Sequence, residues 1–222
     1  MVQDPCHGQN GRPRYGPPFF VPKAHIITSP DFLENMAHNR QSCEMNDNAD
    51  LAALIRNIPD YPKPGIMFRD VSSLLLDAGG YRMTMDRLAA LVDPDTQLVA
   101  GIEARGFIVA SALAYVLGLG QLMLRKPGKL PGDKIGTDYT LEYGTDRIEM
   151  HVGHVQPDQK VLLVDDLIAT GGTALAGVDL IRQGGGKVEQ ALFIVDLPDL
   201  GGAQKLRAQN IRVDALIGFD GD

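Results

Sequence analysis

From about residue 50 onward, short apolar runs alternate with longer stretches in which apolar residues recur every three or four positions. The short runs have the length and composition of buried parallel strands. They occupy residues 98–102, 122–124, 161–164 and 191–195. The longer stretches predict helices, at residues 81–91, 108–117 and 174–182. This alternation predicts an α/β fold with a central, mostly parallel sheet flanked by helices, followed by a short helix and a closing strand.

The first 46 residues differ from everything after them. Six prolines punctuate a polar stretch with little periodicity, so we expect residues 1–46 to form a mostly disordered extension. Its acidic residues do not fit a targeting peptide. A translation start at Met36 or Met45 is an alternative explanation of this stretch, and organised sequence begins directly after Met45. We therefore expect one folded domain over residues 47–222.

Composition narrows the possible functions. The 222 residues are 44% hydrophobic, enough for a sizeable core, and their net charge of -7 argues against a nucleic-acid or anionic-membrane surface. No apolar run has the eighteen or so residues of a membrane span, and no secretory signal is visible, so we expect a cytoplasmic protein. Cys6 and Cys43 are too few for a disulfide framework. His151 and His154 lack a third metal ligand nearby, so no metal site is predicted there.

Two carboxylates, Asp165 and Asp166, follow the apolar run at residues 161–164. The carboxyl end of a strand is where an open α/β sheet binds its ligand. Two adjacent carboxylates repel each other and would repel an anion, so we expect them to accept hydrogen bonds from sugar hydroxyl groups.

The turn after these carboxylates has the features of a phosphate site. Gly171 and Gly172 let the backbone approach a ligand closely, so the N–H groups from Ala169 to Thr173 can converge on a phosphate at the N-terminus of the next helix. The hydroxyl groups of Thr170 and Thr173 add donors. The sequence is neither a Walker A loop nor a dinucleotide fingerprint. A tight connection without a ligand is the alternative, but a ribose 5-phosphate would satisfy both the carboxylates and the turn.

Two further segments supply positive charge near the same edge. The turn at residues 103–107, between a strand and a helix, carries Arg105, and the loop after the next strand carries Arg125, Lys126 and Lys129. An acidic protein that binds a polyanion needs such a local basic patch. A surface cation at Arg105 and a solvated charged loop are the alternatives.

The segment that follows this basic loop is polar and contains glycine, and it extends to residue 146. Such a segment can close over a site and exclude water. Residues 148–152 then alternate in the manner of a half-exposed strand.

A proline-rich stretch at residues 58–70 holds Phe68 and Arg69 in a set place on the surface. A helix capped by Asp47 or Asn48 is expected just before it. By residue types alone, the stretch is compatible with an ordinary proline-rich connector.

Five separated motifs carry a family resemblance. Residues 161–174 resemble the phosphoribosyl diphosphate (PRPP) signature of the type I phosphoribosyltransferases. Together with this signature, four further motifs make the chain similar to the adenine phosphoribosyltransferases from about residue 51 to 195. They are residues 62–70, 101–107, 125–131 and 141–146. The resemblance implies the type I phosphoribosyltransferase fold, with a small N-terminal hood at about residues 47–72 and a flexible catalytic loop at about residues 125–147.

The resemblance also implies an activity, the transfer of ribose 5-phosphate from PRPP to N9 of adenine, giving AMP and pyrophosphate in purine salvage. It implies Mg²⁺ held mainly by PRPP rather than by side chains, and a homodimer. Glu142 is then the general base for the N9 proton, and Tyr143 assists loop closure. The adenine-binding residues are Met67, Phe68, Arg69 and Leu197. The PRPP-binding residues are Arg105, Arg125, Lys126, Lys129, Asp165, Asp166, Ala169, Thr170, Gly171, Gly172 and Thr173.

Two other functions stay open at this point. A phosphoribosyltransferase for another purine, hypoxanthine or xanthine, would use the same chemistry. A PRPP-sensing regulator would keep the fold without catalysis, but it should lack the loop carboxylate, and Glu142 is present.

Overall fold

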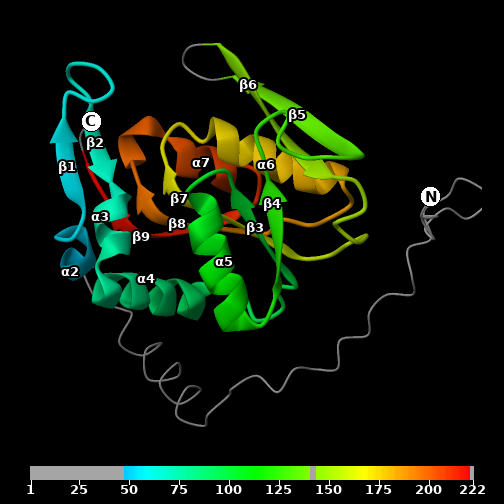
Figure 1. The fold of residues 1–222 in the computed structure, drawn as a ribbon, viewed down its shortest axis with the longest axis horizontal. Helices are drawn as coiled ribbons and strands as arrows, with labels where there is room; N and C mark the ends of the chain where they lie inside the picture. Colours follow the sequence, from blue (N-terminus) through cyan, green and yellow to red (C-terminus); the bar gives the residue numbers. More distant parts are fainter. Residues whose placement is uncertain (1–47, 141–143, 221–222) are drawn as a thin grey trace, which may run out of the picture.

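The computed structural model of the chain describes residues 48–140 and 144–220 (Figure 1). The expected extension at residues 1–46 lies outside the described residues. The elements are α2 (Ala49–Ala52), β1 (Arg56–Pro59), β2 (Met67–Asp70), α3 (Val71–Leu76), α4 (Ala78–Leu91), β3 (Leu98–Ile102), α5 (Gly106–Leu117), β4 (Gly120–Leu124), β5 (Lys134–Thr140), β6 (Thr145–His151), β7 (Val161–Ile168), α6 (Gly172–Gln183), β8 (Gln190–Asp196), the 3-10 helix η1 (Pro198–Leu200), α7 (Gly202–Arg207) and β9 (Arg212–Gly218).

A five-stranded parallel sheet in the order β4-β3-β7-β8-β9 forms the centre of the fold. Figure 1 shows α4 and α5 on one side of this sheet and α6 and α7 on the other. The antiparallel hairpin of β5 and β6 lies on the α6 side, and the hairpin of β1 and β2 lies at one end of the sheet. The predicted α/β architecture is confirmed.

Strand β7 shows why the predicted strands are continuous apolar runs. Val161 and Leu163 are buried against one layer of helices, and Leu162 and Val164 are buried against the other. A strand covered on both faces needs apolar residues at every position. No helix in the part of the chain that the structure describes is long and apolar enough to cross a membrane.

The N-terminal part of the fold differs from the expectation. The helix expected to run through Ile55 is only four residues long as α2, because residues 56–59 pair with β2 instead. Asp70 then caps α3, which was not predicted, by accepting a hydrogen bond from the backbone N–H of Ser72 at 3.1 Å. Asp77 caps α4 in the same way, so this helix begins at residue 78 rather than at residue 81.

Two further corrections concern strands near the site. Strand β7 continues through Asp165 and Asp166 to residue 168, so the carboxylates lie within the strand. The expected half-exposed alternation of β6 is wrong, because Ile148, Glu149 and Met150 are all buried. Within the expected flexible loop, the described residues after the basic segment belong mainly to the β5–β6 hairpin. Its motion remains a prediction.

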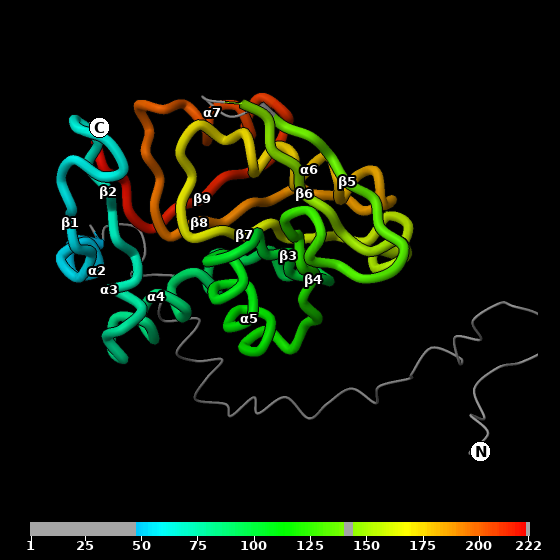
Figure 2. Tube along the Cα trace, turned by 45° about the horizontal axis from the view of Figure 1, so that its top comes forward, coloured from blue at the N-terminus to red at the C-terminus, as the bar shows by residue number. Residues whose placement is uncertain are grey.

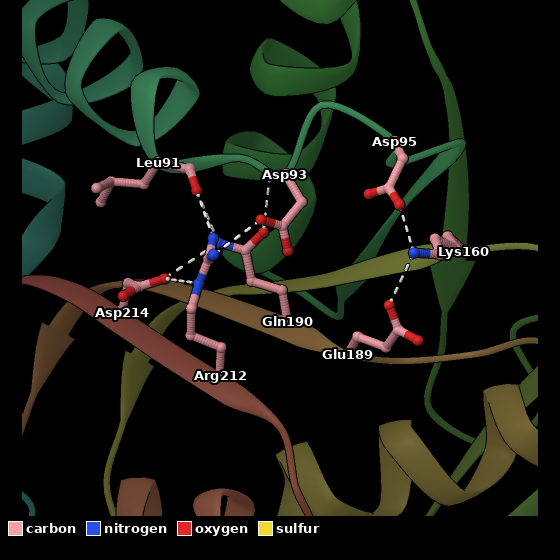
Figure 3. Close-up of polar contacts among 8 residues, drawn as sticks. All are labelled: Leu91, Asp93, Asp95, Lys160, Glu189, Gln190, Arg212 and Asp214. Carbon is pink, nitrogen blue, oxygen red and sulfur yellow. Dashed lines mark hydrogen bonds and ion pairs between the residues drawn. The ribbon is translucent and has the colours of Figure 1, made fainter. Parts of the chain in front are cut away.

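A cluster of hydrogen bonds ties the amino edge of the sheet to the end of α4 (Figure 3). The last carbonyl of this helix, that of Leu91, accepts from Arg212 Nη2 at 2.7 Å and from Gln190 Nε2 at 2.9 Å. Arg212 also binds the carboxylates of Asp93 and Asp214. The side-chain oxygen of Gln190 accepts from the backbone N–H of Asp93 at 3.1 Å. Gln190 is only 3% exposed, so its amide bridges three groups away from solvent.

This arrangement gives a stability prediction. We expect Gln190→Leu to lower the free energy of unfolding by about 2 kcal/mol, because it leaves buried donor and acceptor groups without their partner. Urea denaturation measures the change. The matched control is Lys160→Met, which removes exposed ion pairs with Asp95 and Glu189 on the same edge and should have little effect. Equal losses in the two variants would contradict the assignment.

Candidate active site

The turn between β7 and α6 forms a hollow at the carboxyl edge of the sheet. Gly171 has a left-handed backbone conformation, with φ of +79°, and is the N-cap of α6. The first N–H groups of a helix have no partner within the helix, and the helix dipole favours an anion there. The adjoining cavity has a volume of about 130 Å³. It is lined by Asp165, Leu167, Ile168, Ala169, Thr170, Gly171, Gly172, Thr173 and Ala174. The turn therefore has the geometry of a phosphate site.

The two carboxylates next to this turn have different environments. Asp166 is 4% exposed and binds Nε of Arg105 at 2.5 Å. Asp165 accepts a hydrogen bond from the backbone N–H of Asp166 at 2.9 Å. Burial, and then the negative charge of Asp166, raise the pKa of Asp165 well above its ordinary value. Although burial lowers the pKa of Arg105, the carboxylate of Asp166 raises it overall. Only one of the two carboxylates thus has a close cationic partner.

The turn after β3 lies directly against this acid pair. A Cβ atom on Gly106 would lie 2.7 Å from Oδ1 of Asp165, so only glycine lets the two strand ends come this close. The peptide bond between Glu103 and Ala104, in the same turn, is cis. The predicted meeting of Arg105 with the aspartates at one sheet edge is thus observed.

Glu103, which the sequence analysis did not single out, joins this turn to the basic loop. One of its carboxylate oxygens accepts from the backbone N–H of Lys126 at 2.8 Å, and the carboxylate pairs with Arg125 at 3.3 Å. Burial raises the pKa of Glu103, but the N–H of Lys126 and the guanidinium of Arg125 lower it overall. The only sequence signal for this role is a carboxylate at the first position of the turn, directly after β3.

The three cations of the basic loop are not equivalent. Lys126 donates to the hydroxyl of Tyr139 at 2.6 Å and forms an ion pair with Asp146, both on the β5–β6 hairpin. Burial lowers the pKa of Lys126, but these contacts raise it overall. Arg125 is held by Glu103 and also donates to the carbonyl of Lys129. The side chain of Lys129 is exposed. Lys126 is thus paired with a carboxylate of the hairpin.

The hood brings Phe68 to the same region. Its ring makes an edge-to-face contact with Tyr61 at 5.1 Å, and the guanidinium carbon of Arg105 lies 6.0 Å from its centroid. Arg69 instead stacks over Phe219, with its guanidinium carbon 4.3 Å from the centroid of the ring. Phe219 lies near the C-terminal end of the chain, and no pattern in the sequence indicated this contact.

Leu197 directly follows β8, and its backbone N–H donates to the carbonyl of Ile168 at 3.0 Å, beside the phosphate turn. Met67 begins β2 and is half-buried. The predicted catalytic residues Glu142 and Tyr143 lie outside the described residues. Among residues 48–140 and 144–220, no three His, Cys, Asp or Glu side chains gather into a cluster that could hold a metal ion.

Comparisons with known proteins identify similar sequences and folds. A family profile described as "Phosphoribosyl transferase domain" matches residues 84–215. An adenine phosphoribosyltransferase from Erythrobacter litoralis is 56% identical over 173 residues, which make up 78% of this chain and 97% of that protein. The crystal structure of an adenine phosphoribosyltransferase from Thermoanaerobacter pseudethanolicus matches with a TM-score of 0.74 and 42% identity, covering 77% of this chain and 99% of that one. The Giardia lamblia enzyme, complexed with 9-deazaadenine, matches with a TM-score of 0.74 and 36% identity, covering 79% and 99%.

Proposed function

The chain belongs to the phosphoribosyltransferase family and, within it, to the adenine phosphoribosyltransferases, and we infer that it transfers ribose 5-phosphate from PRPP to N9 of adenine, giving AMP and pyrophosphate. One observation carries this inference at the level of the site. The carboxylates of β7 lie directly before a glycine turn that caps a helix, and Arg105 bridges the acid pair to the turn after β3. A sugar phosphate with a second anionic group fits this arrangement of charges.

The PRPP-binding residues follow from this fit. The turn from Ala169 to Thr173 would bind the 5′-phosphate, and Asp165 and Asp166 would accept hydrogen bonds from the ribose hydroxyl groups. Cleavage of the bond between the anomeric carbon and pyrophosphate develops positive charge on the sugar. A carboxylate held beside the ring stabilises that charge. Substrate binding and transition-state stabilisation would thus use the same two aspartates.

The leaving pyrophosphate requires cations. Arg105, Arg125, Lys126 and Lys129 supply them, with Glu103 holding the backbone of the basic loop against the turn after β3. For Lys126 to bind the substrate, its ion pair with Asp146 must exchange for one with the diphosphate.

Mg²⁺ is the implied cofactor, and it would neutralise charge on the diphosphate. Among residues 48–140 and 144–220 no three acidic or histidine side chains gather into a cage for it, and Asp166 is engaged by Arg105. We therefore assign the ion to the oxygens of PRPP.

Adenine would bind between the hood and the sheet edge. Phe68 and Leu197 are proposed to sandwich the ring, and backbone groups around Met67 and Arg69 are proposed to read its amine and ring nitrogens. Glu142 is proposed as the general base that removes the N9 proton, assisted in loop closure by Tyr143. Hypoxanthine would leave one of these buried donors or acceptors unpaired, which costs about 1–3 kcal/mol of binding free energy.

We also propose that the enzyme is a homodimer in the cytoplasm. On α5, Ile108 and Tyr115 lie two turns apart and are 44% and 85% exposed, and Met123 on the edge strand β4 is 45% exposed. Exposed apolar side chains on neighbouring elements favour burial against a second copy. Sedimentation velocity tests this, because a single species of monomer mass would contradict it. PRPP is a polyanion that does not cross a bilayer, which supports a cytoplasmic location.

The test of function is AMP formation from adenine and PRPP with Mg²⁺, run beside hypoxanthine, xanthine and guanine. We expect turnover with adenine to exceed that with any other base by at least about tenfold, the effect of one mismatched buried polar group. Preference for hypoxanthine or xanthine would identify a different purine enzyme. PRPP binding without turnover of any base would identify a sensor.

A further inference from the structure

The beginning of α7 lies against the outer side of the phosphate turn. The backbone N–H of Gly202 donates to the carbonyl of Ala169 at 3.0 Å, and the ammonium group of Lys205 donates to the carbonyl of Thr170 at 2.8 Å. Figure 2 shows the connection after β7, in yellow, beside the connection from β8 to α7, in orange. Two successive carbonyls of the turn are therefore held by one short segment that follows β8.

Two glycines make this contact possible. A Cβ atom on Gly202 would lie 2.3 Å from the carbonyl oxygen of Ala169 and 2.7 Å from the backbone nitrogen of Gly171. A Cβ atom on Gly171 would lie 2.9 Å from Cα of Gly202. The two backbones thus touch with no side chain between them, and any substitution at Gly202 must displace the turn.

Holding the carbonyls also orients the N–H groups. In a planar trans peptide the C=O and the following N–H point in opposite directions. With the carbonyls of Ala169 and Thr170 directed at α7, the N–H groups of Thr170 and Gly171 face away from α7. Both residues line the cavity beside the turn. Donors that already point at the position of an anion need no reorganisation when it binds.

We propose that Lys205 and Gly202 are positioning residues for the 5′-phosphate of PRPP and AMP, acting through the peptide groups of the phosphate turn. The inference rests on the proposed function in one respect, that the turn binds a phosphate ester. It assigns no direct ligand contact to Lys205, which is exposed on α7. Its role is to fix the carbonyl of Thr170.

The test uses calorimetric titration with ribose 5-phosphate and, separately, steady-state kinetics. Lys205→Met should raise the Kd for ribose 5-phosphate and the KM for PRPP about five- to tenfold, as expected for one lost charge-assisted hydrogen bond. The KM for adenine should stay within about twofold. Lys205→Arg, which restores a cationic donor, should recover most of the affinity. A general loss of folding would instead change the KM values for both substrates and lower the melting temperature.

The control is Lys187→Met, because Lys187 is an exposed lysine whose ion pair with Asp158 lies outside the turn. It removes the same charge without touching Thr170. Equal weakening of ribose 5-phosphate binding by Lys187→Met and Lys205→Met would overturn the proposal. A Kd for Lys205→Met within twofold of the wild-type value would also overturn it, and so would a wild-type protein that does not bind ribose 5-phosphate. If ribose 5-phosphate binding depends on Lys205 but no AMP forms from adenine, the inference stands and the proposed function fails.

Discussion

Glu142→Gln should lower kcat for AMP formation about 10²- to 10⁴-fold, the usual contribution of a general base. The change keeps the size of the side chain and removes the group proposed to take the N9 proton. Because the same group would return that proton in the reverse direction, the cleavage of AMP by pyrophosphate should fall by a similar factor. The Kd for PRPP should stay within about twofold, since the base acts on adenine. Rapid-quench or steady-state assays in both directions measure the effect.

The matched control for this variant is Asp138→Asn. Asp138 lies on β5, four positions before Glu142 in the sequence, and its carboxylate is 70% exposed in an ion pair with Arg147, so it offers the same loss of charge. Asp138→Asn should keep kcat within about twofold. If Glu142→Gln retained more than a third of the wild-type kcat, or weakened PRPP binding as much as turnover, Glu142 would not be the base.

The sheet was predictable because its strands are covered on both faces. β3 spans the predicted residues without error, and each of its residues after Leu98 is buried. The predicted end of α5 at residue 117 is also confirmed, and Gly118, which follows it, has a left-handed backbone conformation with φ of +66°. The buried apolar strand and the regular apolar spacing of the helix were therefore enough to predict the elements that carry the site.

Polar residues within β7 and β6 account for two wrong predictions. Asp165 and Asp166 resemble the end of a strand in the sequence, yet β7 continues because β8 still pairs with it from Asp165 to Ile168, and Ile168 is again buried. In β6, Glu149 read as an exposed position, but it is 7% exposed, and one of its carboxylate oxygens accepts from the backbone N–H of Gly128 at 3.3 Å. Tertiary partners overrode the local pattern in both strands.

The pairing of the site residues was not predictable. Arg105 and Asp166 are 61 residues apart, and Lys126 and Asp146 are 20 apart, so no helical or strand spacing relates them. The sequence predicted that Arg105, Lys126 and Asp166 lie near the same edge of the sheet, and their roles as ligands of PRPP stay predictions. It could not show that these cations and carboxylates pair with one another.

Asp165→Asn should make the protein more stable near neutral pH and less active by about 10²-fold in kcat/KM for PRPP. Folding raises the pKa of Asp165 above its ordinary value of 3.8, because of burial and the charge of Asp166. The folded state therefore keeps this proton at pH values where the unfolded chain has lost it. The contribution of Asp165 to the stability of the wild type must then fall as pH rises from 3.8 to the folded pKa. Asparagine still accepts the hydrogen bond from the N–H of Asp166 but carries no charge, so it should remove this loss.

Thermal denaturation across pH separates this effect from a general change in packing. The stability gain of Asp165→Asn should be small below the ordinary pKa, grow through the interval above it and then level off. Asp166→Asn is the matched control, and it should destabilise the protein at neutral pH because it leaves Arg105 without its buried anionic partner. A loss of stability in both variants at neutral pH would contradict the assignment. Opposite signs, together with the loss of activity in Asp165→Asn, would show that the site keeps a destabilising carboxylate next to the ribose position because substrate binding and catalysis need its charge.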